Sequence, residues 1–316
     1  MQYWHRRRAK RHLARLRSAP AYIKEPGISS IVAFKVGMTH ALVSDDTESP
    51  TKGMEVSRAC TLLEVPSTEV YGIRLYSNDP NTLYRNTSLE VMNSNSAKRL
   101  HIKTVKNDET KVESIRLKLK EFTDATALLA SYPKGMSVGQ HHPTRYEAHV
   151  GGKTIEEKFD FLSGILGKEL KVIDVFKNGE YVDVTAVTKG KGWAGPIKRF
   201  GIARQFHKNT GHARHVGTLG PFTPAKVFYT VPQAGQLGFG YRTEHNKRIL
   251  KMGVRGDGAI TPSSGFANYG VVRNDYMIVN GSVPGPAKML VRVRKSIRDR
   301  NARGIKEPKI SYIRVN

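Results

Sequence analysis

The chain has 316 residues, enough for one large domain or about two ordinary ones, and 52 Lys and Arg against 27 Asp and Glu give it a formal net charge of +25. Its one cysteine, Cys60, excludes an intrachain disulfide framework and a cysteine-built zinc site, and favours a reducing compartment. The longest apolar runs, such as residues 31–34, fall far short of the ~18 residues that span a bilayer, so we expect a soluble protein.

The chain begins with a basic segment. Residues 1–24 contain no Asp or Glu, and we predict a basic N-terminal extension over residues 1–27. No apolar stretch follows the first bases, which argues against a secretory signal; an organelle transit peptide, also Arg-rich and acid-free, stays open as an alternative. The bases of this segment that we expect to contact a partner are Arg6, Arg7, Arg8, Lys10, Arg11, Arg15 and Arg17.

Short segments typical of β-strands recur along the chain, bounded by Gly and Pro. They cover residues 30–44, 56–65, 69–77, 169–176, 180–188, 276–283, 288–293 and 309–315. Several short strands with such boundaries predict a β-barrel or a sandwich. We therefore expect a mainly β domain over residues 28–316.

The middle of the chain differs in charge and periodicity. Residues 45–170 hold 18 acidic and 17 basic side chains, so their charges nearly cancel. Apolar residues at helical spacing predict a helix over residues 110–132, ending before Pro133, and a shorter one over residues 159–166, closed by Gly167. These signals predict an α/β insertion into the β domain over residues 77–168.

A second acid-free run occupies residues 184–243. It has nine bases, ten glycines and four prolines in 60 residues, and no sustained period of 2 or 3.6. A stretch of this length without regular structure is uncommon inside a compact domain unless a partner holds it. Glycine lets a backbone approach a ligand closely, so we predict an extended RNA-binding finger over residues 189–242.

The distribution of charge points to a polyanionic partner. Outside residues 45–170 the chain has 35 basic and 9 acidic side chains. Like charges at this density repel one another and destabilise a compact state, whereas RNA phosphates neutralise them and release counterions. A plain solvated basic face and an anionic membrane surface fit less well, the latter because it requires an amphipathic basic helix that Gly and Pro interrupt here.

The candidate RNA-binding residues of the finger are its bases, its histidines and two aromatic side chains able to stack on unpaired bases. They are Lys189, Lys191, Trp193, Lys198, Arg199, Arg204, His207, Lys208, His212, Arg214, His215, Phe222, Lys226 and Arg242. Trp193 and Phe222, flanked by Gly and Pro, are expected to be exposed. Phe228 and Tyr229 lie beside valines in strand-like sequence and are expected in the core.

Two motifs resemble nucleotide sites but lack their context. Residues 190–195 read Gly-x-Gly-x-x-Gly, yet Pro196 follows at once and no acidic residue stands ~20 positions on. The Gly-Lys-Thr of residues 152–154 lacks the earlier glycine of a phosphate loop, because Glu147 occupies that position. We therefore expect no nucleotide cofactor.

Metal binding and catalysis are also not favoured. His207, His212 and His215 stand beside Lys208 and Arg214, which repel a cation, so RNA contact or simple exposure is favoured over metal ligation. An RNA-cleaving or RNA-modifying enzyme remains the alternative function. Such an enzyme needs converging carboxylates, and those near the basic runs are widely spaced in the sequence: Asp183, Glu244, Asp257 and Asp275.

Several ordered blocks resemble the signature sequences of the L-three family of large-subunit ribosomal proteins, archaeal type. The blocks are residues 35–40 (KVGMTH), 187–192 (VTKGKG), 195–201 (GPIKRFG), 217–227 (GTLGPFTPAKV), 231–238 (VPQAGQLG), 242–248 (RTEHNKR) and 281–286 (GSVPGP). The likeness extends over most of the chain from about residue 28. The block at 242–248 adds His245, Lys247 and Arg248 to the candidate RNA-binding residues.

The resemblance implies a translation-protein-type β-barrel with a long extended basic finger loop and a basic N-terminal extension beside it. It implies a structural constituent of the cytoplasmic large ribosomal subunit that binds large-subunit ribosomal RNA and acts early in assembly. The finger, centred on residues 193–232, would extend toward the peptidyl transferase centre, with its tip at residues 217–224. Neighbouring large-subunit proteins would be partners; no membrane, small-molecule substrate, metal or cofactor is implied.

The chain departs from the family pattern in two places. Phe222 stands where relatives often have Trp, so we expect weaker base stacking at the fingertip. The first 20 residues lack the Gly- and Ser-containing leader of archaeal relatives, so the resemblance does not predict their path.

Overall fold

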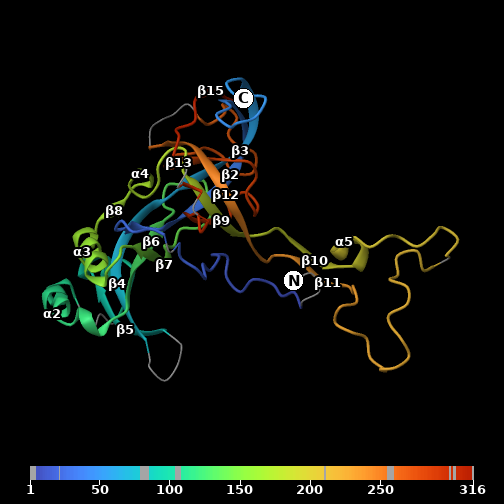
Figure 1. Ribbon diagram of the computed structural model, residues 1–316, viewed down its shortest axis with the longest axis horizontal. Helices are drawn as coiled ribbons and strands as arrows, with labels where there is room; N and C mark the ends of the chain where they lie inside the picture. Colours follow the sequence, from blue (N-terminus) through green and yellow to red (C-terminus); the bar gives the residue numbers. More distant parts are fainter. Residues whose placement is uncertain are drawn as a thin grey trace.

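The computed structural model describes residues 5–20, 22–78, 85–103, 108–209, 211–254, 260–298, 300–301 and 304–314. Two antiparallel β-sheets and a few short helices form the body of the protein, and a two-stranded ribbon and a long loop extend from it (Figure 1). The mainly β fold predicted from the sequence is confirmed.

The larger sheet has seven strands and curls until the strand at one end pairs with the strand next to the other end. Its strands, in sheet order, are β14 (Leu290–Lys295), β9 (Tyr181–Val187), β12 (Tyr241–Gly253), β13 (Asp275–Asn280), β3 (Glu55–Val65), β2 (Ser30–Ser44) and β15 (Ile310–Ile313). β14 pairs with β9 and also with β2, where Leu290 stands opposite Phe34. The hydrogen-bonded order therefore returns on itself, and we call this unit the curled sheet.

The second sheet takes its strands mainly from the middle of the chain. Their order is β1 (Gly27–Ile28), β7 (Thr144–Gly151), β6 (Asp124–Tyr132), β4 (Ser67–Asn78) and β5 (Arg85–Met92), and β8 (Glu169–Leu170) pairs with β4. Residue 77, where the sequence suggested that the insertion begins, lies within β4. The chain passes from β3 in the curled sheet to β4 in the second sheet through Pro66 alone.

Short helices flank both sheets and the ribbon. They are α1 (Ser94–Arg99), α2 (Val112–Arg116), α3 (Ile155–Ile165), α4 (Val172–Val175) and α5 (Pro196–Phe200), with 3-10 turns at Glu109–Lys111 and Leu119–Glu121. Thr154 caps α3 by accepting a hydrogen bond from the backbone of Glu157, and α3 buries Phe159 and Leu162. The helix predicted over residues 159–166 is thereby confirmed.

One continuous hydrophobic core joins the two sheets. It includes Ile31, Leu63 and Val184 from the curled sheet and Ile73 and Leu129 from the second sheet, all fully buried. Strands covered on both faces need apolar residues at nearly every position, which explains the loose alternation of their sequences. The strands predicted at residues 30–44, 56–65, 69–77, 180–188, 276–283, 288–293 and 309–315 are present with small shifts at their ends.

Two predictions of regular structure are wrong. The helix expected over residues 110–132 ends early, and β6 occupies its second half, because a short buried apolar run fits a central strand as well as a helix. The strand expected over residues 169–176 is only the two-residue β8 followed by α4. There Asp174 accepts a hydrogen bond from the backbone of Lys171 at 2.9 Å, closing a helical turn.

The acid-free segment forms the part of the molecule that lies farthest from the second sheet. β10 (Gly190–Ala194) pairs with β11 (Gly235–Gly238), and we call this pair the ribbon. Between α5 and β11, the described residues of 201–234, here the long loop, form no helix or strand. In Figure 1 this yellow-to-orange loop projects away from both sheets. No helix in the described ranges is long and apolar enough to cross a bilayer.

Candidate nucleic-acid interface

The ribbon supports the long loop at its base. Its register pairs Trp193 with Gln236 and Ala194 with Gly235, and a bulge separates this part from the pair formed by Gly190 and Gly238. Gly238 has a φ of +70°, and a Cβ there would lie 2.1 Å from the carbonyl oxygen of Lys189. The turn back into β12 thus depends on a glycine at this position.

Helix α5 holds the start and the end of the long loop together. Pro196 begins the helix, and Gly201 ends it in the left-handed conformation at a φ of +70°. Arg199 extends across to the returning chain, where Nη1 donates to the Gln233 carbonyl at 2.8 Å and Nε donates to that of Gln236 at 3.2 Å. Its guanidinium is therefore fixed by the protein itself.

The N-terminal segment, residues 5–20, runs beside the ribbon (blue in Figure 1). The backbone N–H of Ala9 donates to the Phe239 carbonyl at 2.8 Å, and the Tyr241 hydroxyl donates to the Arg11 carbonyl at 3.3 Å. Farther along, Arg294 donates to the Ser18 carbonyl at 2.9 Å. These contacts bring two acid-free stretches, distant in sequence, to one side of the molecule.

Most predicted RNA-binding side chains are exposed on this side or on the long loop. Exposed are Arg7, Arg8, Lys10, Arg11, Arg15, Arg17, Lys189, Lys191, Trp193, Lys198, Arg204, His207, Lys208, His212, Arg214, His215, Phe222, Lys226, Arg242 and His245. Half-buried are Arg6, Arg199, Lys247 and Arg248. Exposure makes contact with a large partner possible; which of these side chains touch RNA stays a prediction.

Three residues of the 242–248 block have partners within the protein. Arg248 forms a bidentate ion pair with Asp46, at 2.7 and 2.6 Å, which lowers the pKa of that carboxyl. Lys247 lies 3.6 Å from Glu244, and His245 Nδ1 lies 3.0 Å from the carboxylate of Asp183. Arg248 and His245 thus connect strand β12 to Asp46 and Asp183, whereas Lys247 pairs within its own strand.

The described carboxylates among those considered for catalysis do not converge. Asp183 is fully buried, and Glu244 faces Lys247 on the surface of β12. Asp257 lies outside the described residues, and Asp275 begins β13 on the far side of β12. Within the described part of the chain, no group of three or more His, Cys, Asp or Glu side chains is arranged to hold a metal ion.

The aromatic predictions divide into two outcomes. Trp193 is 79% exposed and Phe222 97% exposed, as expected from their Gly and Pro neighbours. The prediction that Phe228 and Tyr229 lie in the core is wrong, because they are 43% and 75% exposed. The residues around them form turns instead of a strand, so no sheet partner covers them.

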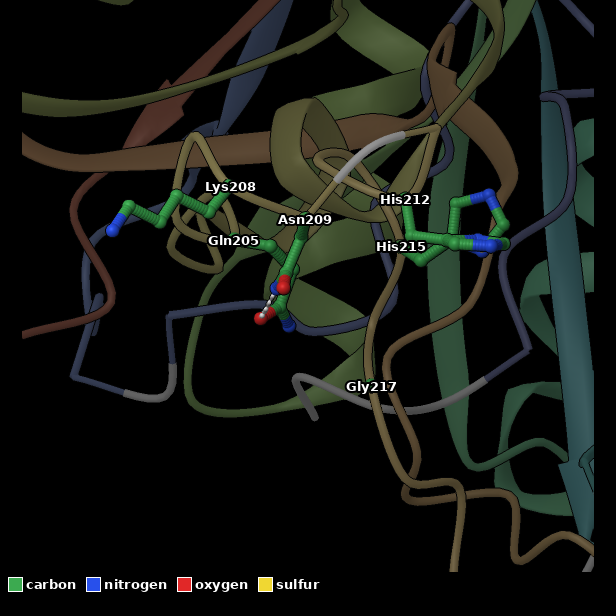
Figure 2. A pocket seen from close by; sticks show the side chains of 6 residues that line it. All are labelled: Gln205, Lys208, Asn209, His212, His215 and Gly217. Atoms are coloured by element: carbon green, nitrogen blue, oxygen red, sulfur yellow. Dashed lines mark hydrogen bonds between the residues drawn. The ribbon is translucent and has the colours of Figure 1, made fainter.

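A shallow hollow forms where the long loop turns. Gln205, Lys208, Asn209, His212, His215 and Gly217 line it, as Figure 2 shows. The Nδ1 atoms of His212 and His215 lie 3.3 Å apart, and Asn209 donates to the Gln205 side chain at 3.3 Å. All lining groups are neutral or basic, a donor-rich set suited to an anion.

Sequence analysis missed the residues that position this interface. Phe200, Gly235, Gln236 and Phe239 hold the ribbon, α5 and the N-terminal segment against one another. Several contribute backbone atoms, which carry no residue-specific signal. Phe200 lies in the block at 195–201, and Gly235 and Gln236 lie in the block at 231–238, but neither block indicates which residues position the N-terminal segment.

Comparison with known proteins shows the family of the chain. A family model described as Ribosomal protein L3 matches residues 1–315. The large ribosomal subunit proteins uL3 of Methanothermobacter thermautotrophicus and Methanocaldococcus jannaschii are each 42% identical over 98% of this chain, covering 93% and 92% of those relatives. That of Methanococcus vannielii is 41% identical over 98% of this chain and 92% of its own length.

Proteins of the matched family are structural components of the ribosome and not enzymes, so the alternative prediction of an RNA-cleaving or RNA-modifying enzyme is wrong. The resemblance first seen in the ordered signature blocks is confirmed over nearly the whole length. The chain belongs to the ribosomal protein L3 family.

Proposed function

We propose that this protein is a structural constituent of the cytoplasmic large ribosomal subunit that binds large-subunit ribosomal RNA early in assembly. The N-terminal segment, the ribbon and the long loop form its RNA-binding surface, and the long loop extends toward the peptidyl transferase centre. The observation that carries the proposal is the convergence of two acid-free, base-rich stretches on one side of the molecule.

The charge of this surface requires an anionic partner. Between residues 184 and 243 there is no carboxylate, and the bases of the long loop are exposed. Each Lys or Arg that meets a phosphate releases a counterion and adds affinity independent of sequence. Exposed Trp193 and Phe222 add flat surfaces on which unpaired bases can stack.

The long loop has little of its own to hold it in shape. Its described residues make turns, and every described residue from 217 to 230 is exposed. A segment that buries so little apolar surface gains too little free energy to order itself, so a partner that surrounds it would supply the contacts that order it. RNA folded around the loop would supply that order, which fits a protein that joins the subunit while its RNA is still folding.

The body of the protein serves as the outer anchor. We assign the curled sheet to the translation-protein-type β-barrel, interrupted by the second sheet over about residues 77–168 and by the finger over residues 189–242. The second sheet lies at the opposite end of the molecule from the long loop in Figure 1, and its segment carries nearly balanced charge. Such a surface suits solvent or neighbouring ribosomal proteins.

A tethered cleavage probe tests the path of the loop. Cys60 is buried, and burial raises its pKa to about 11, so a cysteine introduced as Phe222→Cys is the reactive thiol for an iron chelate. In reconstituted subunits we expect hydroxyl radicals to cleave RNA of the peptidyl transferase region. A Leu117→Cys variant, on an exposed position beside the second sheet, is the control.

The control should cleave peripheral RNA or none. Identical cleavage patterns from positions 222 and 117, or no cleavage near the peptidyl transferase region from position 222, would contradict the proposed orientation.

A further inference from the structure

Two arginines from distant parts of the chain approach the same aromatic ring. The guanidinium carbon of Arg6 lies 4.8 Å from the centre of the Phe200 ring, and that of Arg199 lies 5.0 Å from the same centre. Arg6 Nη1 also lies 3.5 Å from the carbonyl oxygen of Arg199. This cluster joins the N-terminal segment to α5 at the base of the long loop.

The cluster places two positive charges near each other in a half-buried setting. The pKa of Arg199 is lowered, first by burial and then by the charge of Arg6. The Arg199 guanidinium nevertheless keeps its charge at neutral pH, because the pKa of an arginine side chain lies far above 7. The stretches that carry them, residues 1–24 and 184–243, contain no carboxylate, and the ring offsets the repulsion only in part.

We propose that Arg6 and Arg199 together form a binding site for one backbone phosphate of RNA, which bridges the N-terminal segment and the base of the long loop. This Arg6–Arg199 site rests on the proposed RNA binding and deepens it. A phosphate accepts several hydrogen bonds from forked guanidinium groups, and its negative charge offsets the repulsion between the two cations.

The protein orients one half of the site before RNA arrives. Arg199 uses Nε and Nη1 to hold the carbonyls of Gln236 and Gln233, so its guanidinium has little freedom left to lose on binding. Groups fixed in this way lose less entropy when the ligand binds. Arg6 is positioned by its contact with Phe200 and by the backbone of the same segment, where Ala9 bonds to Phe239.

Gly235 offers a way to move Arg199 without removing a charge. A Cβ at this position would lie 2.8 Å from Cζ of Arg199 and 2.9 Å from its Nη1. The clashing atoms are the end of a flexible side chain, so Gly235→Ala displaces the guanidinium while the strand pairing of the ribbon remains possible. Arg6→Gln removes the other half of the site.

Phosphate-ethylation interference tests the site with the full-length chain and an archaeal large-subunit ribosomal RNA transcript. RNA ethylated at random phosphates is bound, and the positions absent from the bound fraction are mapped. We expect one phosphate whose ethylation excludes binding of the wild type but not of Arg6→Gln or of Gly235→Ala. Arg6→Gln should also reduce the slope of log affinity against log salt by about 1.

Arg7→Gln is the matched control, because it removes one charge from the exposed neighbour of Arg6. With Arg7→Gln, interference should be lost at a different phosphate or at none. The Arg6–Arg199 site is wrong if no single phosphate loses its interference in both Arg6→Gln and Gly235→Ala. It is also wrong if the same phosphate loses its interference in Arg7→Gln. In either case RNA binding itself stands. If the wild type shows no interference and no salt dependence, the proposed function itself fails.

Folding of each variant is checked by its thermal melting curve. Should Gly235→Ala fail to fold, Phe200→Leu takes its place, because it removes the ring that both guanidiniums contact. Ethylation of the same phosphate should then no longer exclude binding. If Phe200→Leu and Arg6→Gln both keep the wild-type interference pattern, the proposal is overturned.

Discussion

At the scale of single residues, Asp183 connects three segments of the curled sheet. Its carboxylate is fully buried on β9 and accepts hydrogen bonds from the backbone of Asn246 at 3.0 Å and of Ile297 at 3.1 Å. Arg294, itself buried, lies 3.2 Å away, and His245 lies 3.0 Å away. This residue, a candidate for catalysis on sequence grounds, has a structural role.

We therefore expect Asp183→Asn to destabilise the protein by about 3–5 kcal/mol, because it leaves the buried guanidinium of Arg294 without its counter-charge. Urea unfolding measures the change. Asp160→Asn is the control, since it breaks the ion pair with Arg116, which is largely exposed, and should change stability by less than about 1 kcal/mol. Equal effects of the two substitutions would contradict the structural role of Asp183.

Cys60 should be chemically inert in the folded protein. Burial raises its pKa to about 11, and its Sγ lies 3.4 Å from the carbonyl oxygen of Thr39, so the reactive thiolate is scarce at pH 8. Alkylation followed by mass spectrometry should show labelling only at denaturant concentrations that unfold the curled sheet. Rapid labelling of the native chain would show that β3 opens locally.

Phe222 contacts nothing that stabilises the protein, because 97% of its side chain is exposed. Phe222→Ala should leave the thermal midpoint of the free chain unchanged. In the ribosome it should change chemical probing of the neighbouring RNA without releasing the protein, since one stack contributes only ~1–3 kcal/mol among many phosphate contacts. Dissociation on this single change would contradict that distribution of binding energy.

At the scale of elements, prediction from sequence succeeded where the pattern of apolar residues fits only a strand or only a helix. The strand at residues 30–44 was predicted to the residue, because its apolar positions lie between Gly- and Pro-bounded turns. Residues 110–132 were predicted as helix because apolar residues from Val112 to Leu129 recur at helical spacing. Only the burial of β6 between β4 and β7 decides that this part is a strand.

The candidate interface was predictable in its chemistry but not in its geometry. Absence of carboxylates marked both basic stretches, yet nothing in the sequence showed that Ala9 bonds to Phe239 or that Arg199 holds Gln233. The prediction failed for Phe228 and Tyr229 because their apolar neighbours suggested a strand in a segment that has no pairing partner. Long-range contacts of this kind are set by the whole fold.

Deleting residues 205–225 should leave the two sheets folded. The described residues of this range form no strand pairs, and the contacts of Arg199 that close the base of the loop lie outside it. Shortening a loop changes its closure entropy only slowly. Circular dichroism should give a melting transition close to that of the wild type, and subunits containing the variant should assemble poorly.

A loss of cooperative melting in the deletion variant would contradict the view that the loop depends on RNA rather than on the sheets. Normal assembly of its subunits would equally contradict a role for the loop in RNA binding.

At the scale of the whole molecule, the part with balanced charge and the part with excess positive charge also differ in structure. The second sheet has nearly balanced charge and shares an apolar core with the curled sheet, so we expect it to fold without a partner. The N-terminal segment, ribbon and long loop carry bases without carboxylates and bury little. We expect the first part to provide stability and the second to bind an anion, which would offset its self-repulsion.

Salt dependence of RNA binding tests this division most directly. The slope of log affinity against log salt counts the phosphates neutralised, at ~0.7–0.9 per contact. We predict a steep slope for the full chain with large-subunit ribosomal RNA, and a much shallower one when residues 1–17 and 205–225 are both deleted. An affinity that barely changes with salt, or an equal slope for the doubly deleted chain, would contradict the account.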